Sequence, residues 1–302
     1  MLIFLGIAVA VGILIFSASV WGPNILLKPD RRSASFYQER YGYSSPPQIG
    51  LTHESCSFVT RDGLRISYWI INSNIGNYHK GDIIYLHGIT DSKVSGLNYA
   101  KFLTEEGWRV IIPDLRRHGE SEGEYCTYGY HEKYDVSQLI DDILKNDSHN
   151  RVILLGISMG GAIGIQTAAI DERIAGVIAV APFYDLFSIA LDHQAKKIGI
   201  RNKLLLKRVL EVAGKRASFN YNEVSPAKVM PALKTPILIV HGTKDRTVKI
   251  EYSRRLATMS SNARLLLVPD AGHTDVLEIG GEEYMNELLR FISLAINGES
   301  PV

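Results

Sequence analysis

The chain has 302 residues, of which 46% are hydrophobic and 22% are charged, so it is long enough to bury one large core or two modest ones. Its formal net charge of +1 provides no general basic field, which argues against nucleic acid as a partner of the whole protein. Two cysteines, Cys56 and Cys126, allow at most one disulfide and lack the spacing of a metal site.

The amino-terminal segment 1–24 carries no charged side chain and is apolar without a break over 1–16. At about 1.5 Å per residue, such a helix can cross the hydrocarbon core of a bilayer. The pattern predicts a single-pass transmembrane anchor, with a cleaved signal peptide and an exported protein as the alternative. Basic residues outnumber acidic ones just after it, which favours a cytoplasmic domain: Lys28, Arg31, Arg32 and Arg40 against Asp30 and Glu39.

Residues 25–50 contain the pair Pro46-Pro47, which is typical of an extended connection. We therefore expect a linker over 25–50 and a single folded domain over 51–302.

Short apolar runs then alternate with helical stretches. The later runs are continuously apolar, as expected for strands that helices cover on both faces. Alternation of strand and helix predicts an α/β fold with a mostly parallel sheet, whose ligands bind beyond the carboxyl ends of the strands. The eight predicted strands are 56–60, 64–71, 82–88, 108–114, 151–158, 176–182, 236–242 and 264–270.

Polar residues stand at the carboxyl ends of several of these strands. His87-Gly88 ends one, Ser158 another, and Asp245 and His273 follow the last two. A serine, an acid and a histidine in this chain order are the groups that base-assisted nucleophilic attack requires.

The glycines around Ser158 have the spacing G-x-S-x-G, with Gly156 and Gly160 on either side of the serine. A sharp turn from strand to helix leaves little room for larger residues at these two positions. Neither the dinucleotide pattern G-x-G-x-x-G nor the P-loop pattern fits the cluster, while a purely structural turn is an alternative.

With these features, the sequence resembles the α/β-hydrolase superfamily over about residues 55–297. It is most similar to the S33-type branch of lysophospholipases, esterases and serine aminopeptidases, which includes membrane-anchored bacterial hydrolases. The resemblance rests on His87-Gly88 and on four further motifs: "DLRRHGES" at 114–121, "GISMGG" at 156–161, "HGTKDRTV" at 241–248 and "AGHTD" at 271–275. It implies an eight-stranded sheet flanked by helices, with a helical cap insertion.

The resemblance also implies the roles of three residues: Ser158 as the nucleophile, His273 as the general base and Asp245 as the acid that orients it. The backbone N–H groups of Met159 and Ile89 are the expected oxyanion donors, although Thr90 could replace Ile89. Asp185 is an alternative acid, while His87 and His118 are expected to support loops.

The segment 183–226 is longer than an ordinary connection and has helical patterning, so we expect a cap over the site. Its apolar face is predicted at Ile198, Leu205, Val209 and Val212. From Asp192 to Arg216 it holds eight Lys or Arg against two acids, which suggests either a solvated face or contact with an anionic membrane leaflet.

The predicted function is that of a serine hydrolase that cleaves carboxylic esters, among them lipid-like or medium-chain acyl esters, through an acyl-enzyme. The alternatives are a peptidase or amidase with the same triad, and a non-catalytic binding module of this fold. The expected partners are a small acyl substrate and, through the amino-terminal helix, a membrane. No cofactor or metal is expected, and the oligomeric state is left open.

Overall fold

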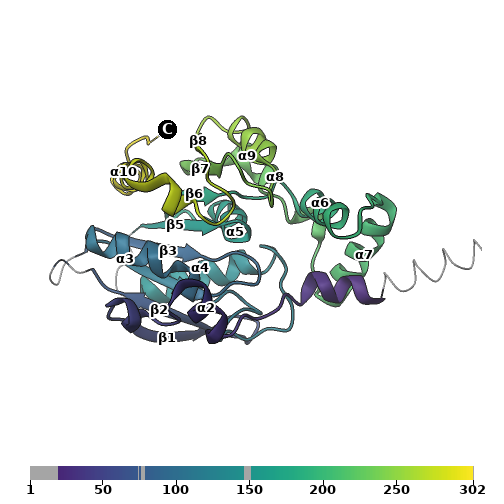
Figure 1. Cartoon of the computed structure of the whole chain (residues 1–302), viewed down its shortest axis with the longest axis horizontal. Helices are drawn as coiled ribbons and strands as arrows, with labels where there is room; N and C mark the ends of the chain where they lie inside the picture. The colour runs from purple at the N-terminus through teal and green to yellow at the C-terminus, as the bar shows by residue number, and fades with distance from the viewer. Residues whose placement is uncertain (1–19, 74, 76–78, 146–150, 302) are drawn as a thin grey trace, which may run out of the picture.

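The computed structural model describes residues 20–301 except for residues 74, 76–78 and 146–150. An eight-stranded sheet forms the centre, in the order β1-β2-β4-β3-β5-β6-β7-β8 (Figure 1). The edge strand β1 runs antiparallel to β2, β2 runs antiparallel to β4, and the remaining pairs are parallel. The strands are β1 (Glu54–Val59), β2 (Arg65–Ile71), β3 (Asp82–Leu86), β4 (Arg109–Pro113), β5 (Val152–Ile157), β6 (Ile174–Val180), β7 (Ile237–Gly242) and β8 (Ala263–Val268).

The prediction of eight strands in a mostly parallel α/β sheet is therefore confirmed. Every residue of β3, β6 and β7 is buried, in keeping with their mostly apolar sequences.

Helices cover both faces of the sheet, and the sheet separates the core into two clusters. Alternate residues of β3 serve the two sides: Ile84 and Leu86 belong to one cluster, Ile83 and Tyr85 to the other. The first cluster lies under α4 (Glu132–Ile143), α5 (Met159–Ala168) and α9 (Ile250–Ala257). The second lies under α3 (Leu97–Glu105) and α10 (Val276–Ile296), which is kinked at Gly281.

Short helices complete the connections between these elements. They are η1 (Pro46–Ile49), η2 (Lys93–Gly96), η3 (Tyr221–Glu223), α8 (Pro226–Val229) and η4 (Met230–Ala232).

The prediction of a transmembrane anchor at 1–24, and of a membrane location through it, is corrected by the structure. In the part of the chain that is described, no helix combines the length and the apolar character that a membrane span requires. Residues 1–19 of the predicted anchor lie outside that part. Its last residues belong to a helical stretch at 20–27 that packs on protein: a Cβ on Gly22 would lie 3.0 Å from Val209, and Arg216 donates to Asn24 Oδ1 at 3.0 Å.

The expected linker at 25–50 is also corrected, because this segment is folded against the sheet domain. Leu27 and Tyr37 are 0% and 1% exposed, and the N–H of Cys126 donates to the carbonyl of Leu27 at 2.8 Å. Residues 34–41 form α2 (Ala34–Tyr41), capped by the Ser33 side chain. The two prolines open the 3₁₀ turn η1, since proline at the first helical position loses no hydrogen bond.

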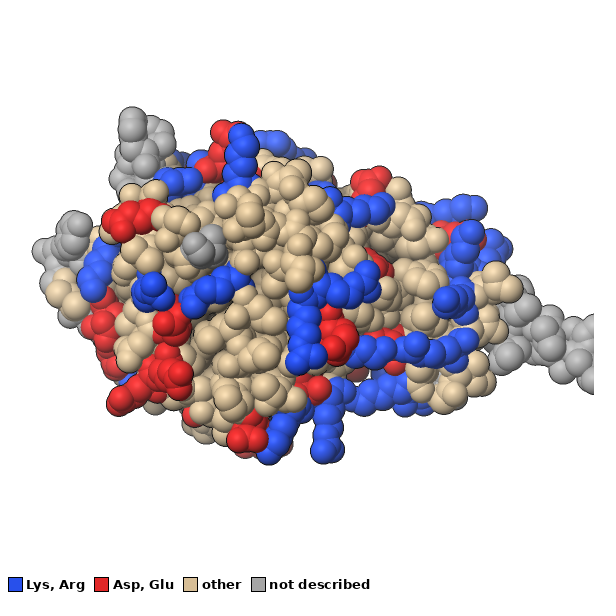
Figure 2. Space-filling view, turned by 90° about the horizontal axis from the view of Figure 1, so that it is seen from above, with Lys and Arg blue, Asp and Glu red and all other residues tan. Residues whose placement is uncertain are grey.

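The segment expected as a cap contains two helices, α6 (Leu186–Ile198) and α7 (Lys203–Arg216). On α7 the buried side chains are those of Leu206, Leu210 and Ala213, whereas the predicted positions Leu205, Val209 and Val212 are only half-buried. The buried face of α7 is thus rotated by one residue from the predicted face. The side chain of Ile198, the fourth predicted position, lies outside the described part of the chain. Basic side chains gather over this end of the molecule (Figure 2).

Candidate active site

Ser158 lies in the turn between β5 and α5. Its backbone has φ 55° and ψ −111°, a conformation that costs energy for a residue with a side chain. Its N–H donates to the carbonyl of Val180 on β6 at 2.7 Å, which ties the turn to the neighbouring strand. The serine thus occupies a strained position at the carboxyl edge of the sheet, where the fold brings ligands.

The two glycines that flank the serine turn are required by close approach of backbone atoms. A Cβ on Gly156 would lie 2.3 Å from the carbonyl carbon and oxygen of Gly160. A Cβ on Gly160 would lie 2.0 Å from the carbonyl oxygen of Leu86, at the end of β3. The predicted reason for these glycines is confirmed, since the amino terminus of α5 sits directly against the backbone of β3.

Gly160→Ala is therefore expected to destabilise the fold by about 3 kcal/mol or more, because the rigid backbone of β3 has to move. A thermal unfolding scan should show this as a midpoint lowered by roughly 6 °C or more. Gly199→Ala is the matched control: its added methyl meets no atom within 4 Å, and the cost is limited to about 1–2 kcal/mol for the left-handed backbone. Equal losses in the two variants would contradict the close contact at Gly160.

Asp245 and His273, from the loops after β7 and β8, are joined by a hydrogen bond. His273 Nδ1 lies 2.7 Å from Asp245 Oδ2. A carboxylate can only accept, so Nδ1 carries the proton and Nε2 of a neutral ring keeps a free lone pair. Asp245 Oδ1 accepts the N–H groups of Thr247 at 2.6 Å and Val248 at 3.0 Å. The loop backbone thereby fixes the carboxylate opposite the ring.

The ionised state of Asp245 is strongly favoured. Burial alone would raise the pKa of this carboxyl group, but hydrogen bonds from His241, His273 and the Val248 N–H outweigh it and hold the pKa well below its usual range. The negative charge opposite His273 is therefore maintained throughout the neutral range of pH.

His241 is a residue of this cluster that the sequence analysis did not single out. It is 0% exposed on β7, and its Nε2 lies 3.3 Å from Asp245 Oδ2 and 3.2 Å from the carbonyl oxygen of Val248. Its Nδ1 lies 2.7 Å from Ser253 Oγ on α9. The signal in the sequence is the pair His241 and Asp245 four residues apart, within the motif already quoted for the acid alone.

The loop after β3 runs beside the serine turn. A Cβ on Gly88 would lie 3.7 Å from Ser158 Cβ and 3.6 Å from the carbonyl oxygen of Ile157. Within the described chain, no acceptor takes the backbone N–H of Met159, Ile89 or Thr90. Unpaired N–H groups therefore exist on both the α5 side and the β3 side of the serine turn.

His87 and His118 support loops, as predicted. His87 Nδ1 donates to the carbonyl of Gly88 at 2.7 Å, and its Nε2 accepts the N–H of Leu115 at 3.0 Å. His118 Nδ1 donates to the carbonyl of Arg116 at 3.0 Å. Burial lowers the pKa of both rings, so both are neutral and hold backbone rather than carry charge.

Asp185, the alternative acid, serves instead as the N-cap of α6. Its Oδ1 accepts the N–H of Ser188 at 2.7 Å, and its Oδ2 accepts the Ser188 hydroxyl at 2.9 Å. Both of its oxygens are thus engaged in the helix cap, while Asp245 has the histidine partner.

Helix α6, in the segment expected as a cap, is held against the loop that carries Asp245. Asp192 on α6 accepts from Lys249 Nζ at 2.7 Å and from the Tyr252 hydroxyl at 2.6 Å. Lys196 donates to the carbonyl of Arg246 at 3.2 Å. Helix α6 therefore lies next to the loop of Asp245, and its apolar side chains Phe187 and Ala190 are only partly buried.

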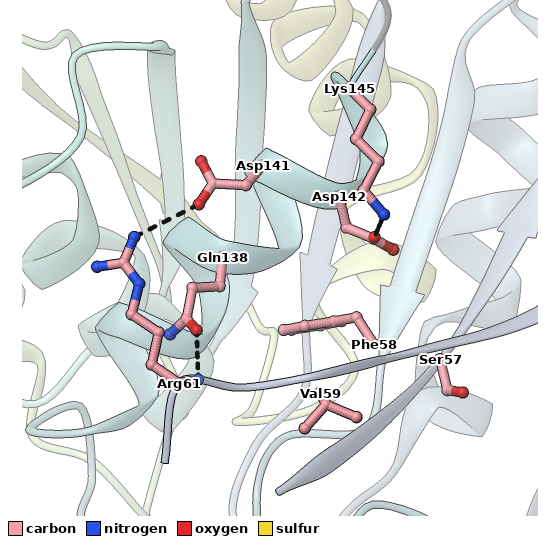
Figure 3. A pocket seen from close by; sticks show the side chains of 8 residues that line it. All are labelled: Ser57, Phe58, Val59, Arg61, Gln138, Asp141, Asp142 and Lys145. Atoms are coloured by element: carbon pink, nitrogen blue, oxygen red, sulfur yellow. Dashed lines mark hydrogen bonds and ion pairs between the residues drawn. The ribbon is translucent and has the colours of Figure 1, made fainter. Parts of the chain in front are cut away.

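A separate pocket lies between the edge strand β1 and α4 (Figure 3). Its charges pair with each other, Lys145 with Asp142 and Arg61 with Asp141. It includes none of the predicted site residues, because β1 is at the opposite edge of the sheet from β7 and β8.

Comparisons with known proteins agree with this architecture. The model of the family described as serine aminopeptidase, S33, matches residues 77–226. The chain is 30% identical to YqkD of Bacillus subtilis over 199 residues, and this alignment covers 63% of each protein. It is 29% identical over 188 residues to the putative esterase YitV of Bacillus subtilis, covering 57% of this chain and 71% of that one.

Among solved structures, the Pyrococcus furiosus esterase Pf2001 superimposes with a TM-score of 0.69 at 22% identity, covering 90% of this chain and 98% of that one. This likeness concerns the fold. Together with the sheet order and the strained serine turn, the matches support a hydrolase with the α/β-hydrolase fold.

Proposed function

We propose that this protein is a serine hydrolase that cleaves carboxylic esters through an acyl-enzyme, with Ser158 as nucleophile, His273 as general base and Asp245 as the acid. The observation that carries the proposal is the 2.7 Å hydrogen bond between His273 Nδ1 and Asp245 Oδ2. This pair lies at the same carboxyl edge of the sheet as the strained Ser158.

In the proposed reaction, His273 Nε2 takes the proton of the Ser158 hydroxyl as the oxygen attacks the ester carbonyl. The carbonyl oxygen becomes an oxyanion, and the free N–H groups of Met159 and Ile89 stabilise it. The imidazolium then gives its proton to the leaving alcohol, which departs and leaves the acyl group on Ser158. Water attacks this ester by the same route and releases the carboxylic acid, so the enzyme returns to its starting state.

Asp245 stabilises the imidazolium and keeps the proton on Nδ1. Among the described hydrogen bonds, none joins Ser158 to His273. Such bonds are often long in the absence of substrate and tighten in the reacting complex.

The acyl side of the substrate is proposed to be of medium chain length. The support is the position of α6, which Asp192 and Lys196 hold beside the acid loop with partly buried apolar side chains. An acyl chain placed on the serine can cover such side chains and remove their surface from water.

Labelling with a fluorophosphonate probe tests the nucleophile. The wild-type chain is expected to be labelled and Ser158→Ala is expected to be unlabelled, because the probe reacts with a serine that a base activates. The Ser158→Ala variant must keep the wild-type unfolding midpoint for this comparison. Labelling that survives in Ser158→Ala would assign the reactive group elsewhere.

The second candidate is a peptidase or amidase with the same residues, which the description of the matched family favours. A series of p-nitrophenyl esters of increasing acyl length, assayed beside amino-acid p-nitroanilides, separates the two. An ester hydrolase is expected to have the higher kcat/KM on the esters by several orders of magnitude. Comparable values on anilides would favour the peptidase.

A further inference from the structure

Helix α2 contacts the loop that would carry the oxyanion donor. Tyr37, in the middle of α2, is 1% exposed and its hydroxyl donates to Asp91 Oδ1 at 2.8 Å. Asp91 follows the donor residue Ile89 by two positions. Because α2 belongs to the segment expected as a linker, nothing in the sequence pattern indicated this contact.

Asp91 closes a tight turn at the end of β3. Its N–H donates to the carbonyl of Gly88 at 3.3 Å, and Thr90 within this turn has φ 63°. A non-glycine residue in the left-handed region costs energy, so the turn needs outside contacts to keep this shape. The N–H of Ser92 also donates to Asp91 Oδ1, at 3.3 Å. The carboxylate of Asp91 is thus the point at which α2 holds the turn.

The state of both partners suits this role. Burial, followed by the negative charge of Asp91, raises the pKa of Tyr37 far above its usual value, so the hydroxyl keeps its proton and remains a donor. Arg32 Nη1 lies 3.6 Å from the same Asp91 oxygen and supplies the opposite charge. Asp91 therefore has two partners from the segment that contains α2.

The same helix also contacts the loop that carries the histidine. Arg40, one turn beyond Tyr37, donates to Thr274 Oγ1 at 3.5 Å, next to His273. The helix therefore spans two loops that are far apart in the sequence and that both belong to the proposed site.

We infer that Tyr37 is a positioning residue of the active site: through Asp91 it fixes the turn 88–91, and hence the N–H of Ile89 that receives the oxyanion. This inference rests on the proposed function. An oxyanion donor is effective only when it is already aimed at the position of the developing charge. Loss of the Tyr37 hydroxyl should impair the transition state while leaving substrate binding nearly unchanged.

The test is Tyr37→Phe, which removes the hydroxyl and keeps the buried ring. We expect kcat to fall roughly 10-fold with KM within about twofold of wild type, as for an interaction made only in the transition state. Tyr43→Phe is the matched control. Tyr43 is also buried, at 8% exposure, and its hydroxyl donates to Asn98 Oδ1 at 2.7 Å. Asn98 belongs to α3 rather than to the turn 88–91. This control should lose a similar amount of stability and keep kcat.

A double-mutant cycle identifies the route. If Tyr37 acts through Asp91, the variant Tyr37→Phe/Asp91→Ala should have the same kcat as Asp91→Ala alone. Multiplicative losses in the cycle, a wild-type kcat in Tyr37→Phe, or an equal loss of kcat in Tyr43→Phe would each overturn the inference.

Failure of the proposed function gives a different result. A wild-type chain that takes up no fluorophosphonate and hydrolyses no ester would overturn both the function and this inference. A wild-type chain that is labelled at Ser158, together with an unimpaired Tyr37→Phe, would overturn the positioning role alone.

Discussion

Replacement of Ser158 by Ala is expected to lower kcat on a p-nitrophenyl ester by about 10⁴- to 10⁶-fold, and His273→Ala should cause a loss of the same order. The reason is that attack needs both the hydroxyl and the base that takes its proton. Once either group is gone the other has no role, so the double variant should be little worse than the single ones. Steady-state kinetics of the three proteins, at matched concentrations and with confirmed folding, measures this.

The acid provides a matched comparison. Asp245→Asn should also lower kcat by several orders of magnitude, because an amide in place of the carboxylate favours the wrong tautomer of His273. Asp185→Asn removes the other acid considered, whose oxygens cap α6, and should keep kcat near wild type. Losses that multiply in the Ser158/His273 double variant, or a loss in Asp185→Asn equal to that in Asp245→Asn, would refute the shared mechanism.

Deletion of residues 1–45 is expected to prevent folding of the remaining chain. It removes Leu27, Tyr37 and Tyr43, which are 0%, 1% and 8% exposed. Loss of one large buried side chain costs about 2–5 kcal/mol, so losing three rivals the total stability of about 5–15 kcal/mol that most domains have. The measurement is the yield of soluble protein and its thermal unfolding transition.

A shorter deletion serves as the control. Removal of residues 1–19 keeps Leu27, Tyr37 and Tyr43 in the chain and should preserve the unfolding transition of the domain. A cooperative, active protein from the chain that starts at residue 46 would show that the contacts of α2 are dispensable.

The sheet and the serine turn could be predicted because their signals are local. A continuously apolar run predicts a strand covered on both faces, and the pair Gly156 and Gly160 marks a turn whose closest contacts are made by the backbone. Asp245 and His273 were predicted from their motifs, and their hydrogen bond follows from two parallel neighbouring strands that end at one edge.

The segment 25–50 could not be predicted in the same way. Its contacts are long-range: Tyr37 meets Asp91, Tyr43 meets Asn98, and Arg31 donates to the carbonyls of Gly119 and Ser121. Each partner lies more than fifty positions away, whereas the Pro46-Pro47 pair gives a strong local signal for a connector. The prediction of a linker followed the local pattern and missed the tertiary packing. The prediction for α7 failed for the same reason: its buried face is rotated by one residue from the predicted face.

The shared carboxylate of Asp192 limits how independently the cap can change. In an enzyme with a cap, exchange of the cap helices alone can alter the range of substrates, provided that the catalytic loops make no essential contacts with those helices. Here α6 supplies the acceptor for Lys249 and Tyr252, the first of which lies four residues beyond Asp245. A transplanted cap without an acid at this position would leave the Lys249 ammonium and the Tyr252 hydroxyl without this acceptor. Variation of the proposed cap is therefore limited by Asp192, which holds Lys249 and Tyr252 beside the loop of Asp245.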